Sequence, residues 1–400
     1  MTANSEPNPK YVVPMSSPDI GEAERQAVLD VLHTPHLSMG PQYSAFEQAV
    51  ADYTGRAQAI SVNSGTAGLH LCVRAAGIQA GDMVITTPFS FVASSNVLLF
   101  EGAIPVFVDV DPLSGNMDPA QLQQAAADLT QGGTAAKKWL PRRGAEQAGA
   151  LKAVLPVDVF GQPVDMDAIQ PTAEQHSLQV IEDACEAIGA AYKGRPAGSL
   201  GNSAVFAFYP NKQMTTGEGG VIVTDDEQAA EFMRALRNQG RAPGDTWLQH
   251  THLGYNYRLD EMSAALGRVQ VGRLDELLAK RERVAGWYGE RLAELPVVET
   301  PQVLPDTTKM SWFVYVIRLD GGIDRDKLIH QLASAGIPAR PYFAPIHLQP
   351  FMVERFGYRP GDFPVTEDLG KRGLALPFSS VMTEEEVEIV CRALAAALTH

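Results

Sequence analysis

The chain has 400 residues, of which 45% are hydrophobic and 20% are charged, and its formal net charge is −15 at pH 7. This acidic balance argues against nucleic acid as a partner, because a phosphate backbone is bound by a basic protein face. Cys72, Cys185 and Cys391 lie far apart without metal-ligand spacing, which argues against disulfides and a metal site and fits a reducing cytosol. Neither a secretory signal nor an apolar span of ~18 residues is visible. We therefore expect a cytoplasmic enzyme or binding protein without a membrane partner.

The N-terminal region is predicted to hold a flexible arm followed by two helices. The first ~15 residues are polar and contain prolines, as is typical of an extended arm. Ser17 or Asp19 then caps an amphipathic helix that runs to about Leu32. A second helix is predicted over 44–53 and ends at Gly55, which serves as its C-terminal cap.

After this point short apolar segments alternate with helical ones. Helices are predicted over 65–76 and 94–101. Short apolar strands separated by helices indicate a mostly parallel sheet covered on both faces, and therefore an α/β fold. The predicted strands are 59–62, 83–86, 105–110, 153–157, 179–181, 204–209 and 220–224.

The rest of the chain predicts an insertion and a smaller C-terminal unit. Residues 131–149 are rich in Gly and Ala and locally basic, which favours a solvated surface insertion, with an anion-binding lip as the alternative. A long helix is predicted over 258–295 and leads toward a C-terminal part. We expect a large domain over 1–270 and a small α+β domain over 271–400. The small domain is predicted to contain a strand at 313–319 and helices at 325–335 and 383–398.

Ligands of an open parallel sheet bind beyond the carboxyl ends of its strands, and the turn over 63–67 lies at such an end. Its sequence is Asn-Ser-Gly-Thr-Ala, and it joins a strand to the following helix. Small residues allow a close approach, and the first amides of a helix favour an anion such as phosphate. A turn that is small for purely steric reasons is the alternative.

A second turn at the end of a predicted strand contains Asp183, which follows the apolar residues 180–181 and Glu182. A carboxylate at this place is either a helix N-cap or the partner of a protonated ring nitrogen. Pyridoxal phosphate (PLP) needs such a partner, because the charged ring is what accepts electrons from a carbanion.

Lys212 lies in the third of these turns, after an aromatic strand and a Pro-Asn pair and before a Gly-rich return. A lysine in a loop is often a solvated charge. The surrounding aromatic and small residues instead favour burial, which suits an amine that forms a Schiff base. Asp183 and Lys212 follow different strands, so they could lie on different sides of one flat cofactor.

Several long motifs in this order resemble the DegT/DnrJ/EryC1/StrS family of PLP-dependent sugar aminotransferases, which have PLP fold type I. The resemblance runs nearly end to end and implies a large PLP-binding domain with a mostly parallel mixed sheet. The motifs that carry it are NSGTAGLHL, DMVITTPFSFVASSNVLLFEGAIPVFVDVDP, VIEDACEAIGAAYKGRPAGSLG, FAFYPNKQMTTGEGGVIVTDD, GYNYRLDEMSAALG and PIHLQP.

The resemblance implies a role for each matching residue. Lys212 is similar to the lysine that carries PLP and shuttles protons, and Asp183 to the partner of the ring nitrogen. The remaining cofactor contacts implied are Gly65 and Thr66 at the phosphate, Phe91 on the ring face, Glu186 near the ring hydroxyl, and Asn256 at the phosphate of the partner subunit's cofactor. Tyr209, Tyr342 and His347 are implied at the sugar, with packing as the alternative, and Gly40-Pro41 at the partner's site. Many members have serine at a phosphate-binding position that is Ala207 here.

For activity, the resemblance implies a homodimer that moves an amino group from L-glutamate to a nucleotide-linked ketosugar. The stretch FYPNKQMTTGEGG is similar to that of 4-keto-6-deoxysugar aminotransferases. Related dehydratases have histidine in place of the lysine, so Lys212 favours aminotransfer. A PLP-dependent lyase or aldolase of the same fold and a non-catalytic regulatory protein are the alternatives.

Overall fold

The computed structural model describes residues 11–399, and its centre is a seven-stranded sheet of order β1-β9-β8-β5-β4-β2-β3. All neighbouring strands are parallel except β9, which runs antiparallel to both β1 and β8. The α/β class with a mostly parallel sheet, predicted from the sequence, is therefore confirmed. The strands are β1 (Gln58–Val62), β2 (Met83–Thr86), β3 (Ile104–Phe107), β4 (Leu151–Val154), β5 (Gln179–Asp183), β8 (Ser203–Ala207) and β9 (Gly220–Thr224).

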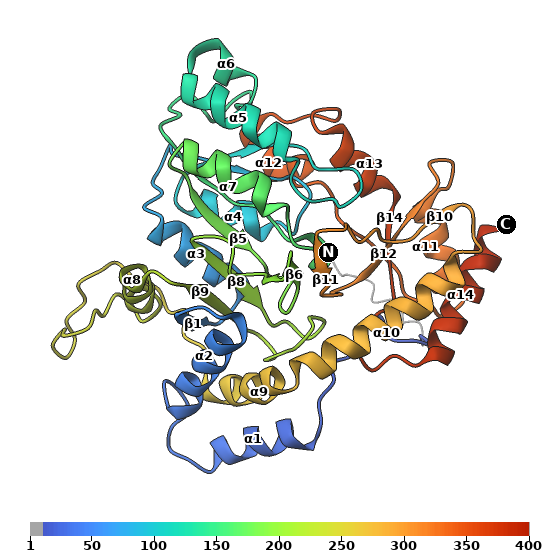
Figure 1. The fold of residues 1–400 in the computed structure, drawn as a ribbon, viewed down its shortest axis with the longest axis horizontal. Helices are drawn as coiled ribbons and strands as arrows, with labels where there is room; N and C mark the ends of the chain where they lie inside the picture. The colour runs from blue at the N-terminus through green and yellow to red at the C-terminus, as the bar shows by residue number, and fades with distance from the viewer. Residues whose placement is uncertain (1–10, 400) are drawn as a thin grey trace, which may run out of the picture.

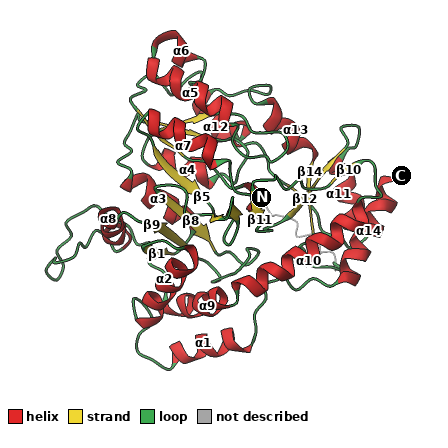
Figure 2. Ribbon diagram, viewed as in Figure 1, coloured by secondary structure: helices red, strands yellow, loops and turns green. Residues whose placement is uncertain are grey.

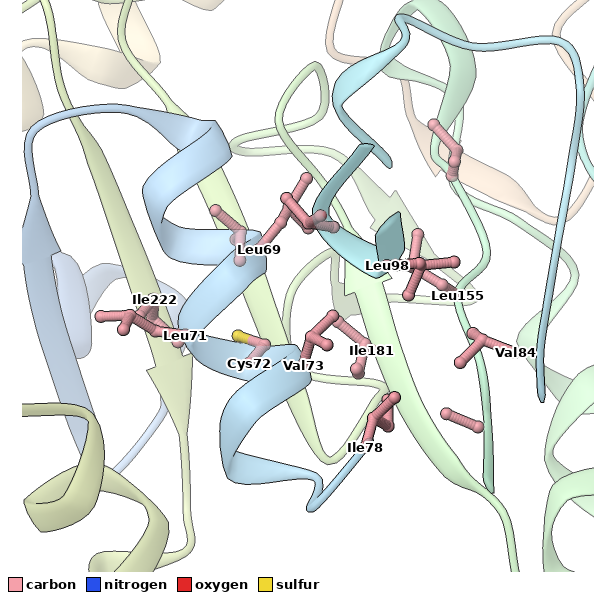
Figure 3. Packing of buried hydrophobic residues seen from close by; sticks show 14 of the residues in the cluster. Leu69, Leu71, Cys72, Val73, Ile78, Val84, Leu98, Leu155, Ile181 and Ile222 are labelled. Atoms are coloured by element: carbon pink, nitrogen blue, oxygen red, sulfur yellow. The ribbon is translucent and has the colours of Figure 1, made fainter. Parts of the chain in front are cut away.

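Helices cover both faces of this sheet (Figure 2). Alternate residues of a strand point to opposite faces, so Ile181 of β5 packs with the core under α3 and α4, and Val180 packs with the core under α5 and α7. Figure 3 shows Leu69, Leu71 and Val73 of α3 lying against residues of the sheet. The helices of these layers are α2 (Pro41–Thr54), α3 (Gly65–Ala75), α4 (Ala93–Phe100), α5 (Pro119–Gln131), α7 (Met166–Gln175), α8 (Glu227–Arg237) and α9 (Glu261–Gly272).

A second, four-stranded antiparallel sheet of order β10-β12-β14-β13 lies apart from the first (Figure 1). Its apolar core includes residues of three helices and is separate from the cores of the large sheet. Helix α10 (Leu274–Leu292) connects the two regions. The elements are β10 (Val298–Glu299), β12 (Tyr315–Leu319), β13 (Arg340–Pro341), β14 (Gly373–Leu376), α11 (Arg325–Ser334) and α14 (Glu384–Leu398). The domain boundary at residue 270 stays a prediction.

Small elements complete the chain. A three-stranded sheet pairs β11 (Thr307–Lys309) with β6 (Ala191–Tyr192) and β7 (Arg195–Pro196). Short helices α12 (Pro350–Phe356) and α13 (Pro364–Arg372) precede β14, and Val159–Gly161 and Ile346–Leu348 form single 3-10 turns. Among the described residues, none of the helices is both long and apolar enough to cross a membrane.

Two predicted helices differ from the structure. The predicted helix over 258–295 is two helices, α9 and α10, which break at Arg273, whose backbone has φ −108° and ψ 5°. The guanidinium of Arg273 binds the carboxylates of Glu24 and Asp19. Helix α1 (Glu22–Leu32) begins later than predicted, because Asp19 binds Arg273 and Lys280 instead of capping the helix.

Three further segments were singled out in the sequence or stand out in the structure. Residues 1–10 of the predicted arm lie outside the described residues, whereas Val13 is buried in the core of the second sheet. In the predicted insertion, α6 (Gly133–Lys137) is followed by turns, and Arg142 binds Asp362 with two hydrogen bonds. A loop over 241–253 projects beyond α8 (Figure 1) and exposes Trp247.

Candidate active site

A cavity of about 390 Å³ lies at the carboxyl ends of β1, β5 and β8, the place where the fold is expected to bind ligands. It is largely apolar, with a few convergent polar groups, as ligand sites generally are. Its lining residues are Ser64, Gly65, Thr66, Leu69, Ser90, Phe91, Ala93, Val157, Asp183, Cys185, Glu186, Ala207, Tyr209, Asn211, Lys212, Glu218, Gly219, Phe313, Tyr342 and Phe343.

Lys212 enters this cavity from the loop between β8 and β9. Its backbone N–H donates to the carbonyl of Tyr209 at 2.9 Å, which closes the turn. Its Nζ lies 3.7 Å from the centroid of the Phe313 ring and 3.5 Å from Glu186 Oε1. The side chain is 12% exposed. The amine is therefore held between an aromatic face and a carboxylate while it remains accessible from the cavity.

Asp183 is the last residue of β5 and is 5% exposed. One carboxylate oxygen, Oδ1, accepts a hydrogen bond from the backbone N–H of Cys185 at 3.2 Å. Burial raises the pKa of Asp183, because the charged form loses water. A cationic partner in the cavity would favour the ionised form, and a protonated ring nitrogen provides such a partner.

Glu186 lies within 3.5 Å of the Lys212 amine and is 7% exposed. Its Oε2 accepts a hydrogen bond from the backbone N–H of Phe160 at 2.9 Å. Burial raises the pKa of Glu186, and the nearby Lys212 opposes this shift. The residue is therefore fixed at one oxygen and presents the other to the amine.

The first turn of α3 forms a cup for an anion. The side chain of Ser64 caps the helix by accepting a hydrogen bond from Ala67 N, and the first amides of a helix, here those of Gly65 and Thr66, are not used by the helix itself. A Cβ at Gly65 would lie 2.8 Å from the Cβ of Ala207 and 2.9 Å from the sulfur of Cys185. Glycine is therefore required for this close approach.

Two aromatic side chains border the cavity with much of their surface exposed, namely Phe91 at 64% and Tyr209 at 53%. Single exposed aromatics are ordinary, but two beside one cavity offer flat faces to a ring-shaped ligand. Tyr342 also lines the cavity and packs against Phe160 and Phe313. Burial raises the pKa of Tyr342 to about 12, so its hydroxyl stays protonated at neutral pH.

The structure places two of the predicted site residues outside this cavity. Asn256 is exposed, and its carbonyl accepts a hydrogen bond from the side chain of Asn63 at 3.3 Å. His347 is fully buried, with Nε2 3.0 Å from Glu367 Oε1 and its ring against Phe363. The surroundings of His347 are those of a packing residue, the alternative that the sequence left open, and they do not support a sugar contact.

Several residues of the cavity were not singled out in the sequence. Phe313 and Phe343 come from the C-terminal part of the chain, about 100 residues or more after Lys212. No local pattern marks them, since they reach the cavity only through the packing of the second region on the first. Asn211 and Glu218 flank the lysine turn and could have been found from their position in it.

The residues present fit PLP. A half-buried amine, a buried carboxylate with room for a cationic partner, an anion cup and exposed aromatic faces are the groups that this cofactor needs. The fit rests on the close Gly65–Ala207 contact and on the partial desolvation of Lys212 and Asp183. Among the described residues, no group of His, Cys, Asp and Glu side chains is suited to hold a metal ion.

Comparisons with known proteins agree with this geometry. The profile of the DegT/DnrJ/EryC1/StrS aminotransferase family matches residues 18–395. GDP-perosamine synthase of Caulobacter vibrioides is 39% identical over 385 residues, which cover 96% of this chain and 97% of that protein. The structure of Helicobacter pylori PseC, an aminotransferase involved in the biosynthesis of pseudoaminic acid, is similar with a TM-score of 0.86 and 27% identity, over 97% of this chain and 99% of that chain.

A third relative bears on the cofactor. Spr1654 of Streptococcus pneumoniae has been solved in a PLP form and a PMP form, with PMP denoting pyridoxamine phosphate. The PLP form is similar with a TM-score of 0.86 and 25% identity, over 97% of this chain and 98% of that chain. The predicted family, cofactor and enzyme class are confirmed: the chain belongs to the DegT/DnrJ/EryC1/StrS aminotransferase family and is a PLP-dependent sugar aminotransferase.

Proposed function

We propose that this enzyme moves an amino group from L-glutamate to a nucleotide-linked 4-keto-deoxysugar, and that Lys212 carries the cofactor. The observation that supports this most is the meeting of Lys212, Asp183 and the first turn of α3 in one cavity. The name of the Caulobacter relative, GDP-perosamine synthase, supports a nucleotide-linked sugar. The similarity of the lysine loop to that of 4-ketosugar aminotransferases favours the 4-keto position.

In this proposal each side chain has a defined task. When bound, PLP supplies an electron sink for the carbanion at the donor's α-carbon. The amine of Lys212 takes the proton from that carbon and returns it on the cofactor side, which it can do because it is held over the site rather than in bulk water. Asp183 would hold the ring nitrogen in its protonated form, and Glu186 would be the partner of the ring hydroxyl.

The remaining contacts divide between cofactor and sugar. The amides of Gly65 and Thr66 would bind the phosphate, and Phe91 would offer its face to the ring. Tyr209 and Tyr342 are the proposed sugar contacts. Their hydroxyl groups can bind sugar oxygens, whereas the buried His347 is not proposed.

We also propose a homodimer in which each site is completed by its partner. The exposed position of Asn256, outside the cavity of its own subunit, supports this arrangement. Gly40-Pro41, at the start of α2, is the second segment proposed to face the partner's site.

The test is a half-reaction followed by the full one. PLP-loaded enzyme mixed with L-glutamate alone is expected to change from the PLP to the PMP absorbance and to release one 2-oxoglutarate per site. Addition of a nucleotide-linked 4-ketosugar is expected to restore the PLP form and to yield an aminosugar. Lys212→Ala should lose about 10²–10⁴-fold in rate, whereas Lys193→Ala, which replaces a partly exposed surface lysine, should not.

Two results would contradict the proposal at different points. Absence of conversion with every amino donor would exclude the donor half and favour lyase or aldolase chemistry. Conversion by L-glutamate followed by selective use of a 3-ketosugar would retain the donor and exclude the 4-keto assignment.

A further inference from the structure

Arg281 is a fully buried cation in the part of the molecule that joins the two sheets. It lies on α10 and is 1% exposed. Within residues 11–399, its guanidinium has no carboxylate at salt-bridge distance. Such a charge is rarely retained in a protein interior unless its donors are occupied.

Four backbone carbonyls from two separate segments accept hydrogen bonds from the two Nη groups of Arg281, whereas its Nε has no acceptor among the described residues. Nη2 donates to the carbonyl of Asn211 at 3.2 Å and to that of Lys212 at 2.6 Å. Nη1 donates to the carbonyl of Trp312 at 3.2 Å and to that of Phe313 at 3.0 Å. One planar group therefore holds the lysine turn and the segment before β12 at a fixed distance from each other.

These two segments are the ones that place the reactive amine. Lys212 supplies the amine, and the ring of Phe313 lies 3.7 Å below it. Gln213 makes a parallel link, because its Nε2 donates to Ser311 Oγ at 2.8 Å and to the carbonyl of Ser311 at 3.0 Å. Of these two links, the one through Arg281 contacts the backbone of both Lys212 and Phe313.

The chemistry of arginine suits this task. Its planar fork can donate to two acceptors on each side, whereas a lysine ammonium is a single point with three donors. Burial lowers the pKa of Arg281 to about 9, so the group is still charged at neutral pH. Its face lies 5.6 Å from the ring centroid of Phe378, which adds a cation–π contact.

We infer that Arg281 is a positioning residue for Lys212: through their carbonyls it fixes both the residue that carries the amine and the residue whose ring supports that amine. Arg281 does not line the cavity, so it acts on the reaction only through these two residues. The inference rests on the proposed role of Lys212.

The test follows the covalent attachment of PLP to PLP-free protein, measured by stopped-flow absorbance over a range of PLP concentrations. A displaced amine lowers the limiting rate of attachment, while the cofactor pocket formed by Asp183 and α3 still binds PLP. Arg281→Met should therefore lower the limiting rate by about 10- to 100-fold and change the half-saturating PLP concentration less than about threefold. Arg281→Lys should recover part of the rate, because an ammonium can reach some of the carbonyls.

Arg237→Met is the matched control. Arg237 is also buried, at 5% exposed, but it binds Glu47 and the carbonyl of Ser61 rather than the carbonyls of the lysine turn. Its replacement should lower the melting temperature but leave the limiting rate unchanged. An equal loss of rate in Arg237→Met would show a general effect of instability and would overturn the inference.

The role of Arg281 can still be tested if the Arg281→Met variant does not fold. If Arg281→Met is insoluble, an Arg281→Lys protein with the wild-type limiting rate overturns the inference, and a slowed one supports it. Borohydride reduction and peptide mapping of PLP-loaded wild-type protein identify the lysine that carries PLP. This measurement tests the proposed function independently of the Arg281 variants. Attachment at a lysine other than Lys212 would contradict the proposed function, whatever the Arg281 variants do.

Discussion

At the scale of single residues, the proposed phosphate site lacks a hydroxyl group that the family resemblance leads us to expect. The resemblance implies serine at position 207, but this chain has Ala207, whose Cβ lies beside Gly65 at the first turn of α3. The cup therefore depends on backbone amides, which supply hydrogen bonds but no side-chain donor at this position.

Replacing Ala207 with serine is predicted to strengthen cofactor binding. A hydroxyl beside the amides of Gly65 and Thr66 would add one hydrogen bond to the phosphate, with a net gain of about 1 kcal/mol, or about fivefold in Kd. Titration of PLP-free protein with PLP measures this change. Ala207→Val, which adds bulk without a donor, should weaken binding, and an unchanged Kd in Ala207→Ser would place the phosphate elsewhere.

A pair of buried carboxyl groups lies directly behind Asp183. Glu182 accepts hydrogen bonds from the amides of Gly198, Leu200 and Gly201, which favour its ionised form. Asp158 is fully buried and accepts only the amide of Val164, while its Oδ2 lacks a donor among the described residues. Burial and the nearby Glu182 raise the pKa of Asp158 well above 3.8. Burial raises the pKa of Glu182 as well, but its amide hydrogen bonds oppose this shift, so a proton in this pair is favoured on Asp158.

This protonated Asp158 predicts a loss of stability with rising pH. A carboxyl group whose pKa is higher in the folded state makes its full contribution to the free energy of unfolding at pH values below its unfolded-state pKa, which is about 3.8 for Asp158. Between that value and the folded-state pKa, the contribution falls by about 1.4 kcal/mol per pH unit. Asp158→Asn keeps a neutral donor toward Glu182 and should remove this fall, as measured by urea unfolding at a series of pH values.

The companion variant separates the two members of the pair. Glu182→Gln cannot accept all three amide hydrogen bonds and should lower the free energy of unfolding by about 1–3 kcal/mol. A pH dependence of unfolding in Asp158→Asn equal to that of the wild type would assign the proton to another group.

At the scale of elements, α2 is capped by a side chain from far along the sequence. Its own N-cap is Gly40, which has no side chain, and Glu261 of α9 supplies the carboxylate instead. Glu261 is 1% exposed and accepts hydrogen bonds from the amides of Gly40, Gln42 and Tyr43 at 2.8 to 2.9 Å. A Cβ at Gly40 would lie 2.8 Å from Glu261 Oε2, so glycine makes room for the cap.

Removal of this cap is predicted to destabilise the contact between α2 and α9. Glu261→Ala leaves three amides without their acceptor and should lower the free energy of unfolding by about 2–4 kcal/mol. Glu385→Ala, at an exposed first-turn position of α14, should cost less than about 1 kcal/mol. Urea unfolding of both variants measures the difference, and similar losses would contradict a capping role.

These elements show what could be predicted from the sequence. The helix end at Gly55 and the strand over 220–224 follow local rules of glycine caps and apolar runs, and both appear as expected. The break at Arg273 was not predicted, and the ion pairs of Arg273 with residues about 250 positions earlier have no local signal in the sequence. The same distinction holds for the site, where Lys212 follows from its turn and Phe313 follows only from tertiary packing.

At the scale of the whole molecule, shared active sites can be tested by mixing subunits. Lys212→Ala and Asn256→Ala homodimers should both be nearly inactive, because each lacks one part of every site. Each proposed site combines Lys212 of one subunit with Asn256 of the other. In a mixed dimer both changes therefore lie in one site, and the other site is intact. An equal, randomised mixture should therefore recover about a quarter of the wild-type activity.

As a control, two preparations of Lys212→Ala that carry different affinity tags are mixed in the same way. This mixture should recover no activity. Mixed dimers isolated through two tags that remain inactive would show that Asn256 acts within its own subunit.

The projecting loop over 241–253 has an optical consequence. Of the four tryptophans in the chain, Trp247 is 84% exposed, while Trp312 is buried and the other two are half-buried. Iodide should therefore quench the emission of Trp247 first. The loop is closed on itself by hydrogen bonds from Thr251 and Ala242 to Asp245, so this signal reports on a defined surface. Quenching that weakens as the protein is concentrated would locate Trp247 in a contact between subunits, without any added dye.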